Sequence, residues 1–263
     1  MDFKRKDRYT IDDMLNIMKI LRSPNGCPWD KEQTHHSIRN CLIEETYEAV
    51  EAIDNEDAAL LQEELGDVLL QVLFHSQLES EIGHFDFSDV VDGIAKKMIV
   101  RHPHVFGDTV VSGSDEVLVN WDAIKKETKS QTTQAEVLQS VSRALPALMR
   151  SAKVQHKAAK VGFDWPDVSG ALDKVEEEAQ ELREAIASGS PDDRVEELGD
   201  LLFSVVNVSR FLNAEPEQAL SLSCDKFISR FQKVEQLAKE RGVDMASSTL
   251  DELNLLWNDA KAN

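Results

Sequence analysis

An acidic motif that occurs twice constrains the fold of this chain more than any other feature of its sequence. Residues 44–67 begin with Glu-Glu-x-x-Glu and end with Glu-Leu-Gly-Asp, and residues 177–200 repeat both elements at the same spacing. Carboxylates three residues apart lie on one face of a helix. Each copy therefore predicts a hairpin of two helices with facing acidic groups, and the repetition predicts two related domains.

The turn between the two helices is most clearly predicted in the downstream copy, where the sequence is Ser188-Gly189-Ser190-Pro191. Gly189 suits a left-handed position at the end of a helix. Ser190 suits an N-cap and Pro191 the first helical turn. Folding the two helices antiparallel about this turn brings the acidic pairs level with each other, about 10–17 Å from the turn.

Each hairpin is expected to gather four carboxylates. The first acidic patch consists of Glu45, Glu48, Glu64 and Asp67, and the second acidic patch of Glu178, Glu181, Glu197 and Asp200. Converging carboxylates repel one another unless they are protonated or bind cations. Sites made only of oxygen suit hard divalent ions, so we expect Mg²⁺, with Mn²⁺ as an alternative. A solvated acidic surface is the competing interpretation, and the identical spacing of the copies argues against it.

Gly66 and Gly199 lie inside the second predicted helix of each hairpin. Glycine in a helix interior costs about 1 kcal/mol relative to alanine. We expect a close approach of backbone beside each acidic patch to account for these two residues.

The composition favours a folded chain that binds neither nucleic acid nor a membrane. Of its 263 residues 41% are hydrophobic, and the formal net charge is −20. Such an acidic surface repels nucleic acid and anionic lipid. The sequence has no run of 18 apolar residues, no signal-peptide pattern and no C-x-x-C among its three cysteines. These features predict a cytoplasmic protein with reduced cysteines.

Helical periodicity covers most of the chain, and strand-like alternation is nearly absent, which predicts an all-α fold of antiparallel helix bundles. We expect an N-terminal domain over 1–107, a connector over 108–134 with a short helical piece, and a C-terminal domain over 135–263. The main helices are expected at about 10–22, 35–53, 58–80, 216–241 and 249–261.

Basic pairs follow both hairpins. Lys226 and Arg230 lie four residues apart, and Lys97 and Arg101 occupy the matching place upstream. Like charges at this spacing repel on a helix face. Phosphate oxygens or a neighbouring acidic patch would relieve the repulsion, although exposed surface residues remain an alternative.

Aromatic and lysine side chains of the C-terminal half are further candidates for ligand contacts. Lys157 and Lys160 come just before Gly162-Phe163-Asp164-Trp165, a combination that suits a pocket for phosphate and a base. Trp165 either stacks on a base or fills the core. Trp257, in the last predicted helix, either faces inward or covers a ligand.

Two other classes of protein compete with this interpretation. Di-iron and di-manganese carboxylate bundles also place Glu residues on paired helices, but they need Glu-x-x-His on two of them. Neither acidic motif has His at that position. The alternative without catalysis is an acidic helical scaffold or regulatory protein that binds a protein partner through its leucine-rich faces, with one or both acidic sites non-catalytic.

The sequence resembles the MazG family of nucleoside triphosphate pyrophosphohydrolases over nearly its whole length. The resemblance rests on the tandem acidic motifs and on residues 26–30, 101–106, 145–148 and 161–165. It implies an all-α fold of the two-domain bacterial type, usually a homodimer. It also implies Mg²⁺-dependent cleavage of nucleoside and deoxynucleoside triphosphates into monophosphate and pyrophosphate, with a role in clearing or adjusting nucleotide pools.

The same resemblance implies that both acidic patches bind metal and that the C-terminal domain is the main catalytic one. Glu177 points about 100° away from the metal face; it is a second choice that orients a partner, acts as a base or covers the hairpin. Candidates for charge stabilisation of the leaving group, from the same chain or across a dimer, are Lys157, Lys160, Lys226 and Arg230. No residue identifiably selects a base or a sugar.

Overall fold

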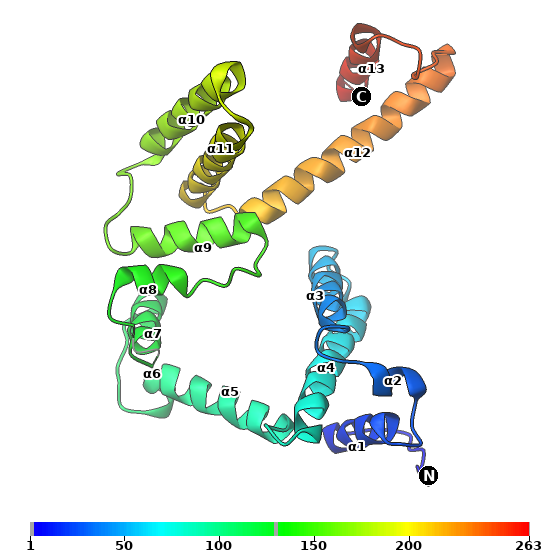
Figure 1. Ribbon diagram of the computed structural model, residues 1–263, viewed down its shortest axis with the longest axis vertical. Helices are drawn as coiled ribbons and strands as arrows, with labels where there is room; N and C mark the ends of the chain where they lie inside the picture. Colours follow the sequence, from blue (N-terminus) through cyan, green and yellow to red (C-terminus); the bar gives the residue numbers. More distant parts are fainter. Residues whose placement is uncertain (1–2, 129–130, 263) are drawn as a thin grey trace. The chain divides into compact units, whose positions relative to one another are not determined.

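Two compact helical units, Met1–Lys125 and Lys126–Asn263, make up the chain. The computed structural model describes residues 3–128 and 131–262, and Figure 1 shows only helices and connecting segments among them. The all-α fold expected from the sequence is confirmed. The division between the units falls inside the segment 108–134, and the domain limits given above stay a prediction.

The first unit is organised around a long helical hairpin. Met18 of the first helix is buried with Ile38, Leu73 and Phe74 in one apolar cluster, which attaches that helix to the hairpin. The helices of this part of the chain are α1 (Ile11–Arg22), α2 (Pro28–Glu32), α3 (Arg39–Asp54), α4 (Ala58–Glu81), α5 (Phe87–Arg101), α6 (Pro103–Phe106) and α7 (Ser114–Thr128).

The second unit repeats the hairpin with a different arrangement around it. Its helices are α8 (Gln134–Gln139), α9 (Ala147–Ala159), α10 (Val168–Ser188), α11 (Pro191–Phe211), α12 (Pro216–Arg241) and α13 (Leu250–Ala262). Helices α10 and α11 form the hairpin, and α9 packs against α11. At the far end of α12, a separate apolar cluster that includes Val234 and Leu256 attaches α13. The acidic hairpin and the chain terminus are therefore held by different sets of contacts.

The turn of the second hairpin confirms two of its three predicted residues. Ser190 caps α11 in a capping box with Asp193, and Pro191 occupies the first turn. The left-handed conformation expected for Gly189 is wrong, because this residue is extended, with φ −83° and ψ 165°. A Cβ at Gly189 would lie 2.8 Å from the carbonyl oxygen of Ala185. Glycine is therefore explained here by close packing of the turn on the preceding helix.

Two further expectations need correction. A Cβ at Gly66 or Gly199 would meet nothing within 4 Å among the described residues. The described part of the chain therefore does not make the close backbone approach expected beside these glycines. The connector also contains more helix than expected, because α7 covers 15 residues.

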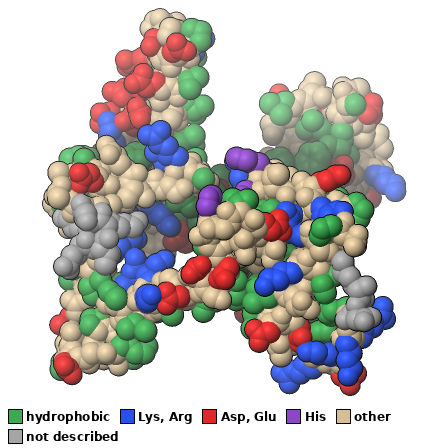
Figure 2. Space-filling view, turned by 60° about the horizontal axis from the view of Figure 1, so that its bottom comes forward, with side chains coloured by type: hydrophobic (Ala, Val, Ile, Leu, Met, Phe, Trp, Pro, Cys, Tyr) green, Lys and Arg blue, Asp and Glu red, His purple; other side chains and the backbone are tan. Residues whose placement is uncertain are grey.

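Large hydrophobic side chains remain exposed on both hairpins, and Figure 2 shows such side chains at several places on the surface. Leu65 and Leu198, which occupy matching positions in the two copies, are 54% and 48% exposed. Leu69 and Leu202 match in the same way, at 40% and 50%. Contiguous apolar surface of this kind marks a place where another surface packs.

Within the described residues, no helix is long and apolar enough to cross a membrane.

Candidate active site

The second acidic patch lies between the facing sides of α10 and α11. One carboxylate oxygen from each of Glu178, Glu197 and Asp200 lies within 4.8 Å of the other two. Burial and the charges of Glu178 and Asp200 raise the pKa of Glu197. Burial, followed by the charge of Glu178, raises the pKa of Glu181 as well. The structure therefore brings Glu178, Glu197 and Asp200 together, with Glu181 close enough for the charges of Glu178 and Glu197 to act on it.

The first acidic patch has the same construction on α3 and α4. Oxygens of Glu45, Glu48 and Glu64 lie within 4.8 Å of one another. Burial and the charge of Asp67 raise the pKa of Glu45, and burial with the charge of Glu48 raises the pKa of Glu64. Both copies of the motif thus concentrate negative charge in a small volume, as their spacing predicted.

Glu178 is the most constrained carboxylate of the second acidic patch. The residue is 5% exposed, and its Oε2 has no hydrogen-bond partner among the described residues. Buried polar atoms are almost always paired, and an unpaired one is unfavourable. Glu178 also belongs to the group of carboxylates whose oxygens lie within 4.8 Å of one another, which is the chemistry of a cation site.

Lys174 supplies the one positive charge that the structure places on this carboxylate among the described residues. Its Nζ donates to Oε1 of Glu178 at 2.6 Å and to Oε1 of Glu177 at 2.8 Å. These two hydrogen bonds raise the pKa of Lys174 above its usual value. The position that matches Lys174 in the first copy is Cys41. Among the described residues, the two acidic patches therefore differ in whether a lysine at this position of the first hairpin helix pairs with the patch.

The sequence prediction missed Lys174, although a signal for it was present. A lysine four residues before a glutamate on a helix forms an ion pair on the same face. Glu177, predicted as a second choice, lies at the edge of the patch and pairs with the same lysine, with 56% of its side chain exposed.

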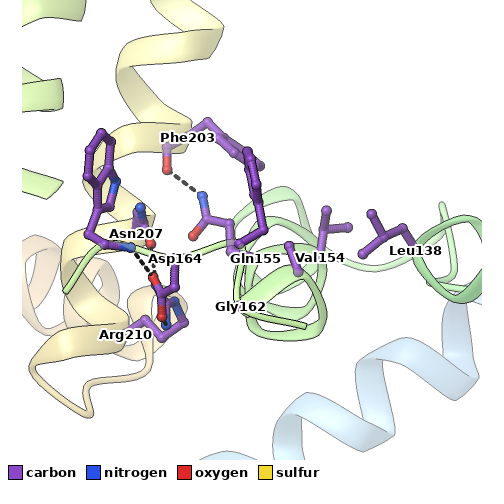
Figure 3. Close-up of a pocket in the computed structure, with 11 residues that line it drawn as sticks. Leu138, Val154, Gln155, Gly162, Asp164, Phe203, Asn207 and Arg210 are labelled. Atoms are coloured by element: carbon purple, nitrogen blue, oxygen red, sulfur yellow. Dashed lines mark hydrogen bonds and ion pairs between the residues drawn. The ribbon is translucent and has the colours of Figure 1, made fainter. Parts of the chain in front are cut away.

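A cavity of about 450 Å³ lies near the acidic hairpin of the second unit, between α9, α11 and the loop before α10. Trp165 lines this cavity, and its ring packs so closely on Gly170 that a Cβ there would lie 2.7 Å away. Figure 3 shows Gln155, Asp164 and Arg210 around the same space. The lysines predicted beside it, at positions 157 and 160, are not among the described residues that line it.

The other predicted ligand contacts lie on α12 and α13. Lys226 is exposed and Arg230 is partly buried on α12, while Trp257 packs on Phe227 with 5.1 Å between ring centroids. Helix α12 packs on α9 and α13 and extends away from the α10–α11 hairpin (Figure 1). The structure therefore does not bring these three residues to the second acidic patch of the same chain.

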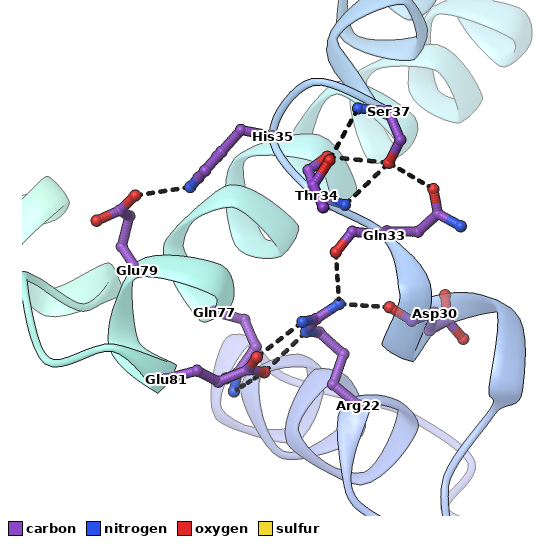
Figure 4. A network of polar contacts seen from close by, with 9 residues as sticks. All are labelled: Arg22, Asp30, Gln33, Thr34, His35, Ser37, Gln77, Glu79 and Glu81. Atoms are coloured by element: carbon purple, nitrogen blue, oxygen red, sulfur yellow. Dashed lines mark hydrogen bonds and ion pairs between the residues drawn. The ribbon is translucent and has the colours of Figure 1, made fainter.

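A polar network in the first unit fixes the loop that precedes α3 (Figure 4). The guanidinium of Arg22 donates two hydrogen bonds of 2.7 Å to the carboxylate of Glu81. It also donates to the backbone oxygens of Asp30 and Gln33. This pairing lowers the pKa of Glu81. One side chain thus joins α1, the end of α2 and the end of α4.

Comparison with known proteins identifies relatives that cover 95% of this chain. The MazG nucleotide pyrophosphohydrolase domain matches twice, over residues 33–106 and 169–235. A Thermotoga maritima protein named nucleoside triphosphate pyrophosphohydrolase/pyrophosphatase MazG is 43% identical over 95% of each chain. The Escherichia coli K12 nucleoside triphosphate pyrophosphohydrolase is 44% identical over 95% of this chain and 97% of its own length. YabN of Bacillus subtilis, described as uncharacterized, is 50% identical over 94% of this chain and 50% of its own. Both matched regions of the domain contain an acidic hairpin.

Proposed function

This chain belongs to the MazG nucleotide pyrophosphohydrolase family, and on that premise we propose that it hydrolyses nucleoside and deoxynucleoside triphosphates to the monophosphate and pyrophosphate, with Mg²⁺ as cofactor. The names of the full-length relatives support the reaction. The observation that carries the proposal is the buried, unpartnered Oε2 of Glu178 inside a group of carboxylates with raised pKa. The physiological role that follows is control of the nucleotide pool.

The donor set of the second acidic patch fits a hard divalent cation. All its ligand atoms are carboxylate oxygens, the type that Mg²⁺ and Mn²⁺ prefer. Their mutual repulsion, expressed in the raised pKa of Glu181 and Glu197, is relieved when a cation binds. When bound, such an ion supplies Lewis-acid charge at the phosphate and acidifies water.

The residues of the chain have separate roles in this proposal. The metal would be held by Glu178, Glu181, Glu197 and Asp200. Water attacks the α-phosphorus, and the bond between this phosphorus and the bridging oxygen breaks as pyrophosphate leaves. Oε2 of Glu178 accepts the cation, while Lys174 stays on Oε1 of Glu178 and on Glu177, and the third N–H of its ammonium contacts phosphate oxygens. Glu177 orients that lysine, since its carboxylate lies 2.8 Å from the ammonium.

A homodimer completes the site in this proposal. Lys226, Arg230 and Trp257 lie on α12 and α13, away from the acidic hairpin of their own chain. The exposed Leu198 and Leu202 next to the acidic patch provide apolar surface against which a second chain would pack. Basic residues of α12 would then reach phosphates bound by the partner.

The C-terminal domain, 135–263, is the main catalytic domain in this proposal, and 1–107 forms a second domain of the same type. The presence of Lys174 only in the second copy is a physical difference that favours this assignment. The three cysteines are unpaired, as expected for the cytoplasm that we propose as the location.

Separation of the products tests the reaction. Chromatography of a reaction of ATP or dCTP with Mg²⁺ is expected to yield monophosphate and pyrophosphate in equal amounts, and Glu178→Gln is expected to yield neither. Glu176→Gln, which changes an exposed carboxylate on the same helix, serves as the matched control and is expected to retain activity. Formation of diphosphate and inorganic phosphate would refute the proposed bond cleavage.

A further inference from the structure

The cavity of the second unit has the composition of a small-molecule site. Its volume of about 450 Å³ lies within the range of ligand pockets, which combine apolar and aromatic walls with a few polar groups. Phe163 and Trp165 contribute aromatic rings from the loop before α10. Two carboxamide side chains, Gln155 from α9 and Asn207 from α11, face the same space (Figure 3).

Gln155 presents a hydrogen-bond acceptor of fixed orientation. Its Nε2 donates to the carbonyl oxygen of Phe203 at 2.7 Å. Because a carbonyl oxygen only accepts, this contact determines which end of the carboxamide remains for the cavity. The remaining atom, Oε1, is buried and has no hydrogen-bond partner among the described residues. Gln155 as a residue is 7% exposed. Such an atom is unfavourable unless a ligand donates an N–H to it.

Asn207 presents the opposite group. Its Oδ1 accepts from Nη2 of Arg210 at 2.8 Å, and a guanidinium only donates, so the amide nitrogen remains for the cavity. No hydrogen bond from that nitrogen to another described residue is present. Arg210 is itself held by both carboxylate oxygens of Asp164 and lies 4.7 Å from the ring centroid of Phe211. Asn207 is therefore oriented by a chain of ionic contacts.

One fixed acceptor and one fixed donor in an aromatic cavity suit the edge of a nucleobase. Adenine and cytosine offer an amino N–H beside a ring nitrogen, and guanine and uracil offer a ring N–H beside a carbonyl oxygen. The π-face of any base can stack on an aromatic side chain such as Trp165. The pattern accepts all four bases, which fits an enzyme that acts on many nucleotides.

The position of the cavity relative to the second acidic patch fits the length of a nucleotide. Asp200 and Asn207 are seven residues apart on α11, so they lie on the same face, about 10 Å apart along the helix axis. A ribose and its 5′-phosphate span a gap of this kind between base and metal-bound phosphates.

We infer that this cavity binds the base of the substrate, with Gln155 and Asn207 as its hydrogen-bonding residues. The inference rests on the proposed function, because it assigns the base of the nucleotide whose phosphates the second acidic patch would bind. It assigns base recognition to α9 and α11.

Asn207→Asp tests the donor. The substitution keeps an oxygen for Arg210 and replaces the donating NH₂ by a second acceptor. We expect KM for ATP, CTP, GTP and UTP to rise about tenfold or more, with kcat within about twofold of wild type. The inhibition constant of inorganic pyrophosphate, which has no base, should stay unchanged. An equal weakening of pyrophosphate inhibition would mean that the new charge repels phosphates, and would overturn the inference.

Gln155→Met tests the acceptor without adding charge, and Gln180→Met, at an exposed glutamine of α10, is its control. Only the first should raise KM, with thermal unfolding used to check that both variants fold. Wild-type KM values in folded Gln155→Met and Asn207→Asp would overturn the inference.

Calorimetric titration with AMP and CMP in EDTA separates this inference from the proposed reaction. Binding by wild type that Asn207→Asp weakens about tenfold or more supports the base pocket even if no triphosphate is hydrolysed. A different outcome would refute the pocket but not the proposed function. In that outcome the enzyme releases pyrophosphate, and wild type and both pocket variants bind AMP and CMP with equal affinity.

Discussion

The ammonium of Lys174 lies 2.6 Å from Oε1 of Glu178, the least exposed carboxylate of the second acidic patch. The other carboxylate oxygen of Glu178 has no partner among the described residues. One oxygen is thus neutralised by the chain and the other remains for a ligand. The upstream hairpin has Cys41 in place of the lysine, so the two patches are expected to respond differently to cations.

Lys174→Met is expected to make the protein depend more strongly on divalent cations. Without the lysine, the carboxylates of the second acidic patch repel one another with no internal cation. The variant should have a lower Tm than wild type in EDTA and should gain more Tm on addition of Mg²⁺. Lys233→Met, which removes an exposed lysine of α12, should behave as wild type in both conditions. An identical Mg²⁺-induced gain in wild type and Lys174→Met would contradict this expectation.

The raised carboxylate pKa values predict how stability depends on pH. Burial and neighbouring charges raise the pKa of Glu64 and Glu197 above the ordinary value of 4.5. The folded state therefore binds more protons than the unfolded state, and this contribution to stability is lost as pH rises from about 4.5 through the raised values.

The double variant Glu64→Gln/Glu197→Gln isolates this contribution. In EDTA its Tm should equal that of wild type near pH 4, where the wild-type groups are protonated, and should exceed it at pH 8. Saturating Mg²⁺ should stabilise only the wild type, because only it retains the ligands, and so should reduce or reverse the difference at pH 8. A pH-independent difference in EDTA would be inconsistent with repulsion inside the patches.

Two glycines of the second hairpin should respond in opposite directions to alanine. Gly199→Ala should stabilise the protein by about 1 kcal/mol, because it lies inside a helix and its Cβ meets nothing. Gly189→Ala should destabilise it, because the new Cβ would lie 2.8 Å from a backbone oxygen. Urea unfolding measures both changes. Destabilisation by Gly199→Ala that depends on protein concentration would mean that a second chain approaches this residue.

Arg22→Met should reduce the free energy of unfolding by about 2 kcal/mol, since it removes charged hydrogen bonds from a side chain that is 7% exposed. Among the described residues, Glu81 would keep only the hydrogen bond from Gln77, and the backbone oxygens of Asp30 and Gln33 would lose the hydrogen bonds from Arg22. Lys96→Met is the control, because it breaks an exposed ion pair with Asp92 and should change stability by less than about 0.5 kcal/mol. Equal effects in urea unfolding would contradict the role given to Arg22.

The acidic hairpins were predictable because helical spacing alone fixes which carboxylates face each other. Glu178 and Glu197 are close in space because their spacing places them on the facing sides of two adjacent antiparallel helices. The cap at Ser190 was predictable from local hydrogen bonding. These features depend on contacts within a turn or between adjacent helices.

The remaining features depend on longer-range packing that spacing does not encode. The extended conformation of Gly189 is set by its approach to Ala185. The position of Trp257, packed on Phe227, follows from how the last two helices associate. The Gln155 contact with Phe203 joins residues 48 positions apart in sequence, so the orientation of its carboxamide required the folded structure.

The central claim is tested most directly by measuring pyrophosphate release from a panel of nucleoside and deoxynucleoside triphosphates with Mg²⁺. The measurement compares wild type, Asp200→Asn and Asp67→Asn. We expect release by wild type, loss of nearly all of it in Asp200→Asn, and retention of most of it in Asp67→Asn. Release that survives Asp200→Asn and disappears in Asp67→Asn would move the chemistry to the first acidic patch. Absence of release from every nucleotide would contradict the proposed activity itself.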